Sequence, residues 1–371
     1  MNIKGISLYR QEIMGFAILQ VILFHSNINL GQSRTLALFE IIKDLGYLGV
    51  DIFFFMSGFS LTMGWLRQKY KLSCFYKKRF IRIVPGFAII VFLSTLCLLL
   101  TSTGKFFLIE AVLKTGIGFV LAKSYDWWFV PAIIFCYIIF PFLAKFIGFF
   151  LVKEGVKSYI YLLLLTLLLP IFICLVLIIF DKKIWLILFA RIPNFILGIV
   201  LGVLLTEQKV KSRLNTKKAI LDNLETIIWI MTMIGWFLLI IGVVWMSREL
   251  AFGYGFLWYP FIFLTFPLIL LLVRVLKILA RAKEKKIAGL FIKILSIFGG
   301  LSYELFLAHG FLIDSSDIYD RWFDSVGLLS LLNIGRYLEY FLVLAASFPF
   351  AIALRKFCIF VFQKFQKYQI S

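Results

Sequence analysis

Two histidines, His25 and His309, are the only ones in the 371 residues, and both lie in long apolar runs. Asp51, Glu304 and Arg191 also lie in apolar runs. Ionisable groups in hydrocarbon are costly and usually mark a functional site. An imidazole beside a carboxylate is the usual arrangement for a general base near neutral pH. We therefore predict one shared polar site with His25, Asp51, Glu304 and His309 as its catalytic candidates, while a packing role for each histidine is the alternative.

A second constellation is the basic run that ends in Arg79-Phe80-Ile81-Arg82. Arginines three residues apart share one face of a helix, and guanidinium groups bind phosphates through paired hydrogen bonds. The run could also be a topogenic charge cluster or a contact for anionic lipid. From charge alone, both interpretations stay open.

The elements that must position these groups are membrane helices. The sequence is 62% hydrophobic and 18% aromatic, well above the roughly 45–50% apolar content of soluble domains. Its apolar runs reach the length of about 20 residues that crosses a bilayer. The sequence therefore predicts an all-α, polytopic integral membrane protein with about ten transmembrane helices and one short interfacial or re-entrant helix at Phe106–Ala122. We expect the ten near residues 12–29, 46–66, 82–102, 128–148, 158–180, 184–206, 226–246, 256–274, 288–312 and 334–361.

The basic residues predict the orientation. Lys and Arg gather on alternate connections, in residues 67–82, 209–218, 274–286 and 355–367. Positively charged loops stay in the cytoplasm, so both termini are expected there, and His25, Asp51, Arg191, Glu304 and His309 fall in the outer halves of their helices. This distribution also explains the net charge of +20 without nucleic acid as a partner.

The remaining sequence predicts no further domain and no metal site. The polar connections are too short to hold a soluble domain, so residues 1–371 are expected to form a single transmembrane domain. The five cysteines are scattered without a C-x-x-C pair, which argues against disulfides and zinc. Trp127 and Trp128 begin the run at 128–148, where aromatic residues form an interfacial belt or, as a second interpretation, contact substrate.

Several motifs resemble the membrane-bound acyltransferase 3 family. Met14–His25 is similar to its first-helix motif, which ends in a histidine, and Gly49–Phe59 to its second-helix signature. Arg79–Arg82 resembles its Arg-x-x-Arg pair. Further blocks that resemble the family follow in the same order, at Trp127–Pro131, Arg191–Gly198 and Ser302–His309.

The resemblance implies a function. His25 is the expected catalytic residue, and Arg79 and Arg82 are the expected binding residues for acetyl-CoA or another acyl-CoA at the cytoplasmic face. The acyl group would pass to a hydroxyl of an extracytoplasmic or lipid-linked glycan, with Trp127, Trp128 and Arg191 as substrate-binding residues, in a bacterial cytoplasmic membrane. Many family members carry a basic residue where this chain has Met14, so the inner end of the first helix lacks that positive charge at this position.

Two other classes of protein fit the same residues. A transporter of a glycan or lipid-linked precursor would use the polar site as a pathway, and a non-catalytic scaffold of a polysaccharide synthesis complex would need no chemistry. Acyl transfer from labelled acetyl-CoA separates the enzyme from both.

Overall fold

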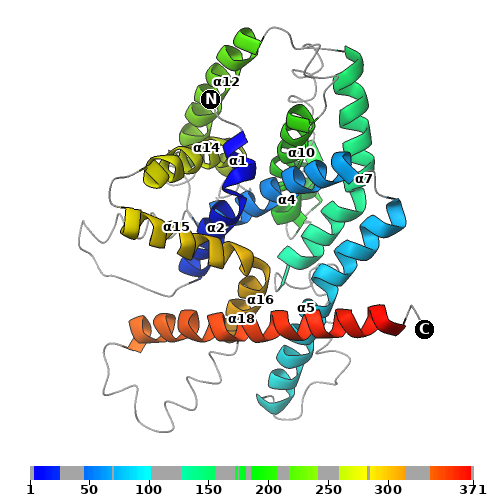
Figure 1. Ribbon diagram of the computed structural model, residues 1–371, viewed down its shortest axis with the longest axis vertical. Coiled ribbons are helices and arrows are strands. Elements are labelled where there is room, and N and C mark those ends of the chain that lie inside the picture. The colour runs from blue at the N-terminus through cyan, green and yellow to red at the C-terminus, as the bar shows by residue number, and fades with distance from the viewer. Residues whose placement is uncertain are drawn as a thin grey trace. The chain divides into compact units, whose positions relative to one another are not determined.

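The computed structural model is helical throughout the residues that it describes (Figure 1). Among the described residues, six helices are long and apolar enough to cross a bilayer, and the broken pair Lys286–Gly300 and Ser302–Ile313 makes a seventh if it counts as one span. The predicted all-α membrane class is confirmed. The count of ten and the cytoplasmic termini stay predictions. The structure describes residues 4–25, 46–68, 71–101, 127–154, 172–173, 175–180, 185–206, 217–240, 259–281, 285–314 and 335–368.

The chain forms two compact units. The first is residues 1–17, 47–75 and 132–299, and the second is residues 18–46, 76–131 and 300–371. Helix α2 (Arg10–Phe24) begins in the first unit and ends in the second. Other helices of the first unit are α1 (Lys4–Leu8), α4 (Tyr47–Gln68), most of α7 (Phe129–Glu154), α9 (Leu186–Phe189), α10 (Ile192–Thr206), α12 (Lys217–Ile240), α14 (Tyr259–Arg281) and α15 (Lys285–Gly300). The second unit holds most of α5 (Leu72–Thr101), with α16 (Ser302–Asp314) and α18 (Gly335–Tyr368).

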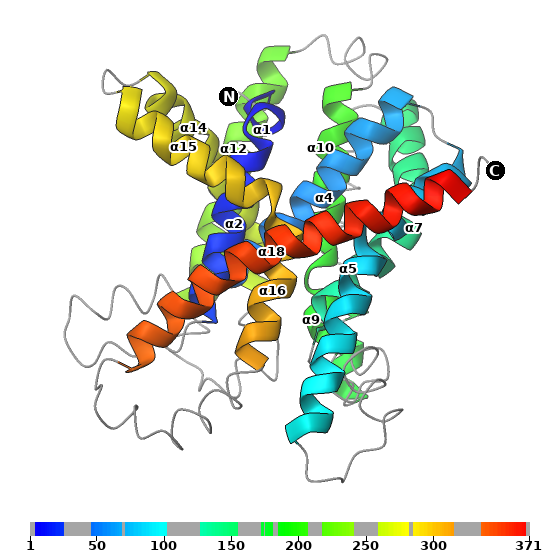
Figure 2. The same ribbon diagram turned by 60° about the horizontal axis from the view of Figure 1, so that its bottom comes forward.

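In the first unit, α4 and α10 lie side by side (Figures 1 and 2). Glycines make this close approach possible. A Cβ at Gly198 would lie on the carbonyl oxygen of Phe55, and a Cβ at Gly58 would lie on that of Phe195. Gly198 and Gly202 have the four-residue spacing that lets the backbones of membrane helices meet. The packing fixes the face of α4 that carries Asp51.

One helix that the sequence predicts as continuous is broken in the structure, and another contains an irregular turn. Residues 288–312 form α15 and α16, which are separated at Leu301, whereas α9 and α10 form one span, Leu186–Thr206, with a turn at Ala190 and Arg191. Pro193 lacks an N–H and so favours the first turn of a new helix. The pair Gly299-Gly300 ends α15, as glycine commonly does. The turn and the break both adjoin candidate site residues.

Several other boundaries differ from the prediction. Helix α12 begins nine residues before residue 226, and α7 and α14 end six and seven residues beyond residues 148 and 274. Helix α5 begins at Leu72, ten residues before the predicted start, so the basic run lies inside the helix. Helix α18 extends to Tyr368. Phe106–Ala122 lies outside the described residues, as does most of the predicted helix at 158–180. In the second unit, α16 packs against α18.

Candidate active site

The two histidines meet in the second unit. The ring centroids of His25 and His309 are 5.2 Å apart, with an interplanar angle of 55°. Nδ1 of His25 donates a hydrogen bond to the carbonyl of Val21, and Nδ1 of His309 donates one to the carbonyl of Leu305, both at 2.9 Å. Because Nδ1 carries the hydrogen, the lone pair of each neutral ring lies on Nε2. The pair therefore offers two proton acceptors held by their own helices.

Exposure distinguishes the two rings. His25 follows the last residue of α2 and is exposed, whereas His309 lies within α16 and is buried. A base that takes a proton from a substrate must be within hydrogen-bond reach of it. His25 is thus the more accessible of the two rings, and His309 is the more enclosed.

Aromatic side chains line the imidazole pair. The Phe306 ring lies 5.5 Å from His309 and 4.5 Å from Phe129, measured between centroids. The Trp127 ring packs on Gly310, the residue after His309, where an added Cβ would lie 3.1 Å from Cη2 of the indole. Trp127 has a φ of 55°, a conformation in which a bulky residue is an outlier. Thus Trp127 packs against α16 at the residue after His309, in a conformation that its backbone disfavours.

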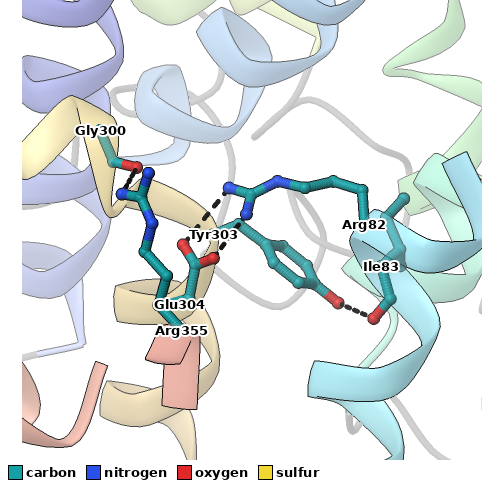
Figure 3. A network of polar contacts seen from close by, with 6 residues as sticks. All are labelled: Arg82, Ile83, Gly300, Tyr303, Glu304 and Arg355. Carbon is teal, nitrogen blue, oxygen red and sulfur yellow. Dashed lines mark hydrogen bonds and ion pairs between the residues drawn. The ribbon is translucent and has the colours of Figure 1, made fainter. Parts of the chain in front are cut away.

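Arg82 and Glu304 form an ion pair in the same unit (Figure 3). Nη1 of Arg82 donates to Oε1 of Glu304 at 2.6 Å, and Nη2 donates to Oε2 at 3.3 Å. The Tyr303 hydroxyl donates to the Ile83 carbonyl at 2.7 Å, and its ring lies 5.8 Å from the guanidinium carbon of Arg82. These contacts fasten the first turn of α16 to α5. The Glu304 side chain is 4% exposed, against 47% for Arg82.

The pair bears on two predicted positions. The sequence places Arg82 at the cytoplasmic boundary and Glu304 in the outer half of its helix, whereas the two side chains share two hydrogen bonds and so lie at one level. Arg79 lies one turn before Arg82 on α5 and is half-buried. Trp128 is also half-buried and contacts Phe129 edge to face.

A third cluster belongs to the first unit. Nη1 of Arg191 donates to Oδ2 of Asp51, and both side chains are fully buried. Nδ2 of Asn194 donates to Oδ1 of Asp51 at 2.7 Å, and the Tyr47 ring centroid lies 6.0 Å from the guanidinium carbon of Arg191. Buried charges need such partners. Both carboxylate oxygens of Asp51 therefore accept a hydrogen bond, one from Arg191 in the turn before α10 and one from Asn194 of α10.

The structure therefore pairs the predicted residues differently from the expectation. Each carboxylate has an arginine partner, Asp51 with Arg191 and Glu304 with Arg82, and the neighbour of His25 is His309. Sequence reasoning missed Asn194 and Tyr303. Asn194 follows Arg191 by three residues in an apolar helix, a spacing that could have identified it.

Arg355 is another residue that sequence reasoning did not assign to the site. Its Nη1 donates to the Gly300 carbonyl at 2.9 Å. Charge distribution gave it only a topogenic role. In the part of the chain that the structure describes, no three His, Cys, Asp or Glu side chains gather where they could hold a metal ion.

These helices and the polar groups between them define a multi-pass membrane protein. The chain belongs to the acyltransferase 3 family, whose model, described as an acyltransferase domain, matches residues 14–356. The matched region includes every residue of the imidazole pair, the arginine–glutamate network and the Asp51 cluster. No curated protein and no solved structure matches the chain.

Proposed function

We propose that this protein is an O-acyltransferase of a bacterial cytoplasmic membrane. It moves an acyl group, acetyl in the first instance, from cytoplasmic acyl-CoA to a hydroxyl of an extracytoplasmic or lipid-linked glycan. The observation that carries the proposal is the imidazole pair, because two rings with Nε2 available lie 5.2 Å apart in a chain of an acyltransferase family.

The reaction needs a base and a path for one proton. Nε2 of His25 takes the proton of the acceptor hydroxyl while the hydroxyl oxygen attacks the thioester carbonyl carbon. The carbon–sulfur bond then breaks, and the thiolate of coenzyme A takes the proton from the imidazolium. An ester and free coenzyme A result. His309 supports the neighbouring ring, and the aromatic wall of Phe306, Phe129 and Trp127 limits water beside the reacting groups.

The donor site of the proposal is the Arg82 turn of α5, with Arg79 one turn before it. The half-exposed guanidinium of Arg82 suits a phosphate because its planar fork makes paired hydrogen bonds. Glu304 binds the guanidinium of Arg82 and so belongs to the proposed donor site. From the sequence, Glu304 had been a candidate for the carboxylate that orients the catalytic histidine. Trp127 and Trp128 remain the proposed acceptor contacts.

Purified protein in lipid nanodiscs tests the proposal. Radiolabelled acetyl-CoA and a mixed glycan acceptor are supplied, and transfer of label to glycan is measured for the wild type and His25→Ala. Transfer by the wild type and its loss in the variant, at equal yield and thermal stability, support the enzyme. Label that stays in acetyl-CoA while the same preparation moves a glycan across a vesicle membrane would support a transporter instead.

A further inference from the structure

Arg355 lies in α18, where no role in binding is assigned to it. The carbonyl that it contacts belongs to Gly300, the last residue of α15. At a helix end this carbonyl has no partner within its own helix. A cap for that carbonyl is therefore the simplest role of Arg355.

The surroundings of Arg355 indicate a second role. Gly86 of α5 marks the point where α5, α16 and α18 converge, since a Cβ there would lie 3.5 Å from the Tyr303 ring and 3.7 Å from Sγ of Cys358. Arg82 precedes Gly86 by four residues, and Arg355 precedes Cys358 by three. Residues at these spacings share one face of a helix. The two arginines therefore flank the same contact, one from each helix.

Each guanidinium is held from one side, that of Arg82 by α16 and that of Arg355 by the last residue of α15. Glu304 binds Arg82 and the Gly300 carbonyl binds Arg355 (Figure 3). The remaining N–H groups of both arginines have no hydrogen-bond partner among the described residues. Arg82 is exposed and Arg355 is half-buried. Two positively charged guanidinium groups, each with unused N–H donors, are accompanied by one carboxylate, that of Glu304. The site therefore carries an excess of positive charge.

Such an arrangement has the chemistry of a phosphate site, because guanidinium forks bind phosphate oxygens bidentately and hold them better than point charges do. We propose that Arg355 is a further donor-binding residue, which together with Arg82 holds the phosphate groups of an acyl-CoA. Glu304 and the Gly300 carbonyl are the positioning groups of this two-arginine site. The inference rests on the proposed function, which supplies the donor.

Binding of coenzyme A to the full-length protein in nanodiscs tests the inference. Isothermal titration compares the wild type, Arg355→Gln and Arg355→Lys. The matched control is Arg274→Gln, which removes an exposed arginine of α14. We expect Arg355→Gln to raise the Kd about tenfold or more, the effect of one lost charge-assisted contact. Arg355→Lys keeps the charge but lacks the planar fork, so its Kd should lie between those of the wild type and Arg355→Gln. The Kd of the Arg274→Gln control should stay within about twofold of the wild type, as for a surface charge.

The two roles of Arg355, as a cap for α15 and as a phosphate-binding residue, predict different results. If Arg355→Gln lowers the melting temperature and leaves the Kd for coenzyme A unchanged, Arg355 only caps Gly300 and the inference is overturned. Pantetheine, which lacks the phosphates, must bind the wild type and Arg355→Gln equally well. A loss of affinity for pantetheine of the same size as that for coenzyme A would also overturn the inference.

A measurement on the wild-type site covers the case in which Arg355→Gln fails to fold. Cys358 lies one turn from Arg355, whereas Cys74 is exposed on the first turn of α5. Coenzyme A must slow maleimide labelling of Cys358 and leave Cys74 unaffected. Unchanged labelling of Cys358 at saturating coenzyme A contradicts the inference, as does a wild type that binds no coenzyme A.

The outcomes also separate the inference from the proposed function. Binding that depends on Arg355 without any acyl transfer leaves the two-arginine site and removes the proposed activity. Acyl transfer with an unchanged donor KM in Arg355→Gln leaves the activity and removes Arg355 from the donor site.

Discussion

The imidazole rings of His25 and His309 lie 5.2 Å apart, and each Nδ1 is bound to a carbonyl four residues earlier in its own chain segment. A carbonyl fixes the tautomer of an imidazole as a carboxylate would, but without placing a negative charge beside it. The pair thus differs from a base oriented by Asp or Glu. The pair consists of two neighbouring imidazoles, each oriented by the backbone of its own helix.

Replacement of each ring by glutamine tests this arrangement. Glutamine donates and accepts hydrogen bonds but cannot take a proton at neutral pH. We expect His25→Gln to lower kcat/KM for acyl transfer by about 10²–10⁴, the usual contribution of a general base. His309→Gln lowers it by a smaller factor, because His309 acts through its neighbour.

The double substitution is the informative control. Residues that act as one unit are not additive, so His25→Gln with His309→Gln should transfer no more slowly than His25→Gln alone. Initial rates with radiolabelled acetyl-CoA measure this, and thermal unfolding in detergent confirms the fold of each variant. Equal, multiplicative losses would show that the rings act independently.

The contact between Trp127 and Gly310 gives a prediction about packing. A Cβ at Gly310 would lie 3.1 Å from the indole, so Gly310→Val drives the ring from its place. Overpacking of this kind costs about 1–3 kcal/mol. The smaller ring of Trp127→Phe should relieve part of that loss, which a double-mutant cycle on the free energy of unfolding measures.

A glycine with room around it provides the control for Gly310. Nothing lies within 4 Å of a Cβ at Gly289 in α15, so Gly289→Ala should leave stability unchanged or raise it by up to about 1 kcal/mol through helix propensity. Additive effects of Gly310→Val and Trp127→Phe would mean that the two side chains do not press on one another.

The sequence predicts the helices well because apolar length is a local property. The span from Tyr47 to Gln68 agrees with the expected 46–66 within two residues at each end. The turn at Arg191 and the break at Leu301 were not predicted, since the apolar runs pass through both without interruption. Pro193 and the pair Gly299-Gly300 carry the only local signal, and proline and glycine also occur inside continuous membrane helices.

The site could be predicted as a set of residues but not as a set of pairs. His25, Asp51, Arg191, Glu304 and His309 stand out because charge is rare in hydrocarbon. Which carboxylate meets which arginine depends on how distant helices pack. Arg82 and Glu304 lie 222 residues apart in the chain, and no periodicity within either helix carries that information.

Close packing of α4 on α10 gives a further prediction. A Cβ at Gly198 would lie on the carbonyl oxygen of Phe55, and backbone cannot move aside as a flexible side chain can. Gly198→Val should therefore destabilise the protein by about 1–3 kcal/mol or more. Gly148→Val in α7, where nothing lies within 4 Å of the added Cβ, is the control. Yields and melting temperatures in detergent compare them, and equal values for both variants would contradict the packing.

Substitutions of the buried pair Asp51 and Arg191 test whether these residues have a structural role or act in the reaction. Asp51→Asn leaves a fully buried guanidinium without its counter-charge, and breaking such a pair costs about 3–5 kcal/mol. Asp51→Leu combined with Arg191→Met removes both charges and should cost less than either single change, because no uncompensated charge remains. Thermal unfolding of the wild type, Asp51→Asn, Asp51→Leu, Arg191→Met and the double variant, with Glu12→Gln as a control for the loss of one acidic group, measures this. If Asp51→Asn unfolds at the wild-type temperature yet transfers no acyl group, the carboxylate acts in the reaction and the structural role is wrong.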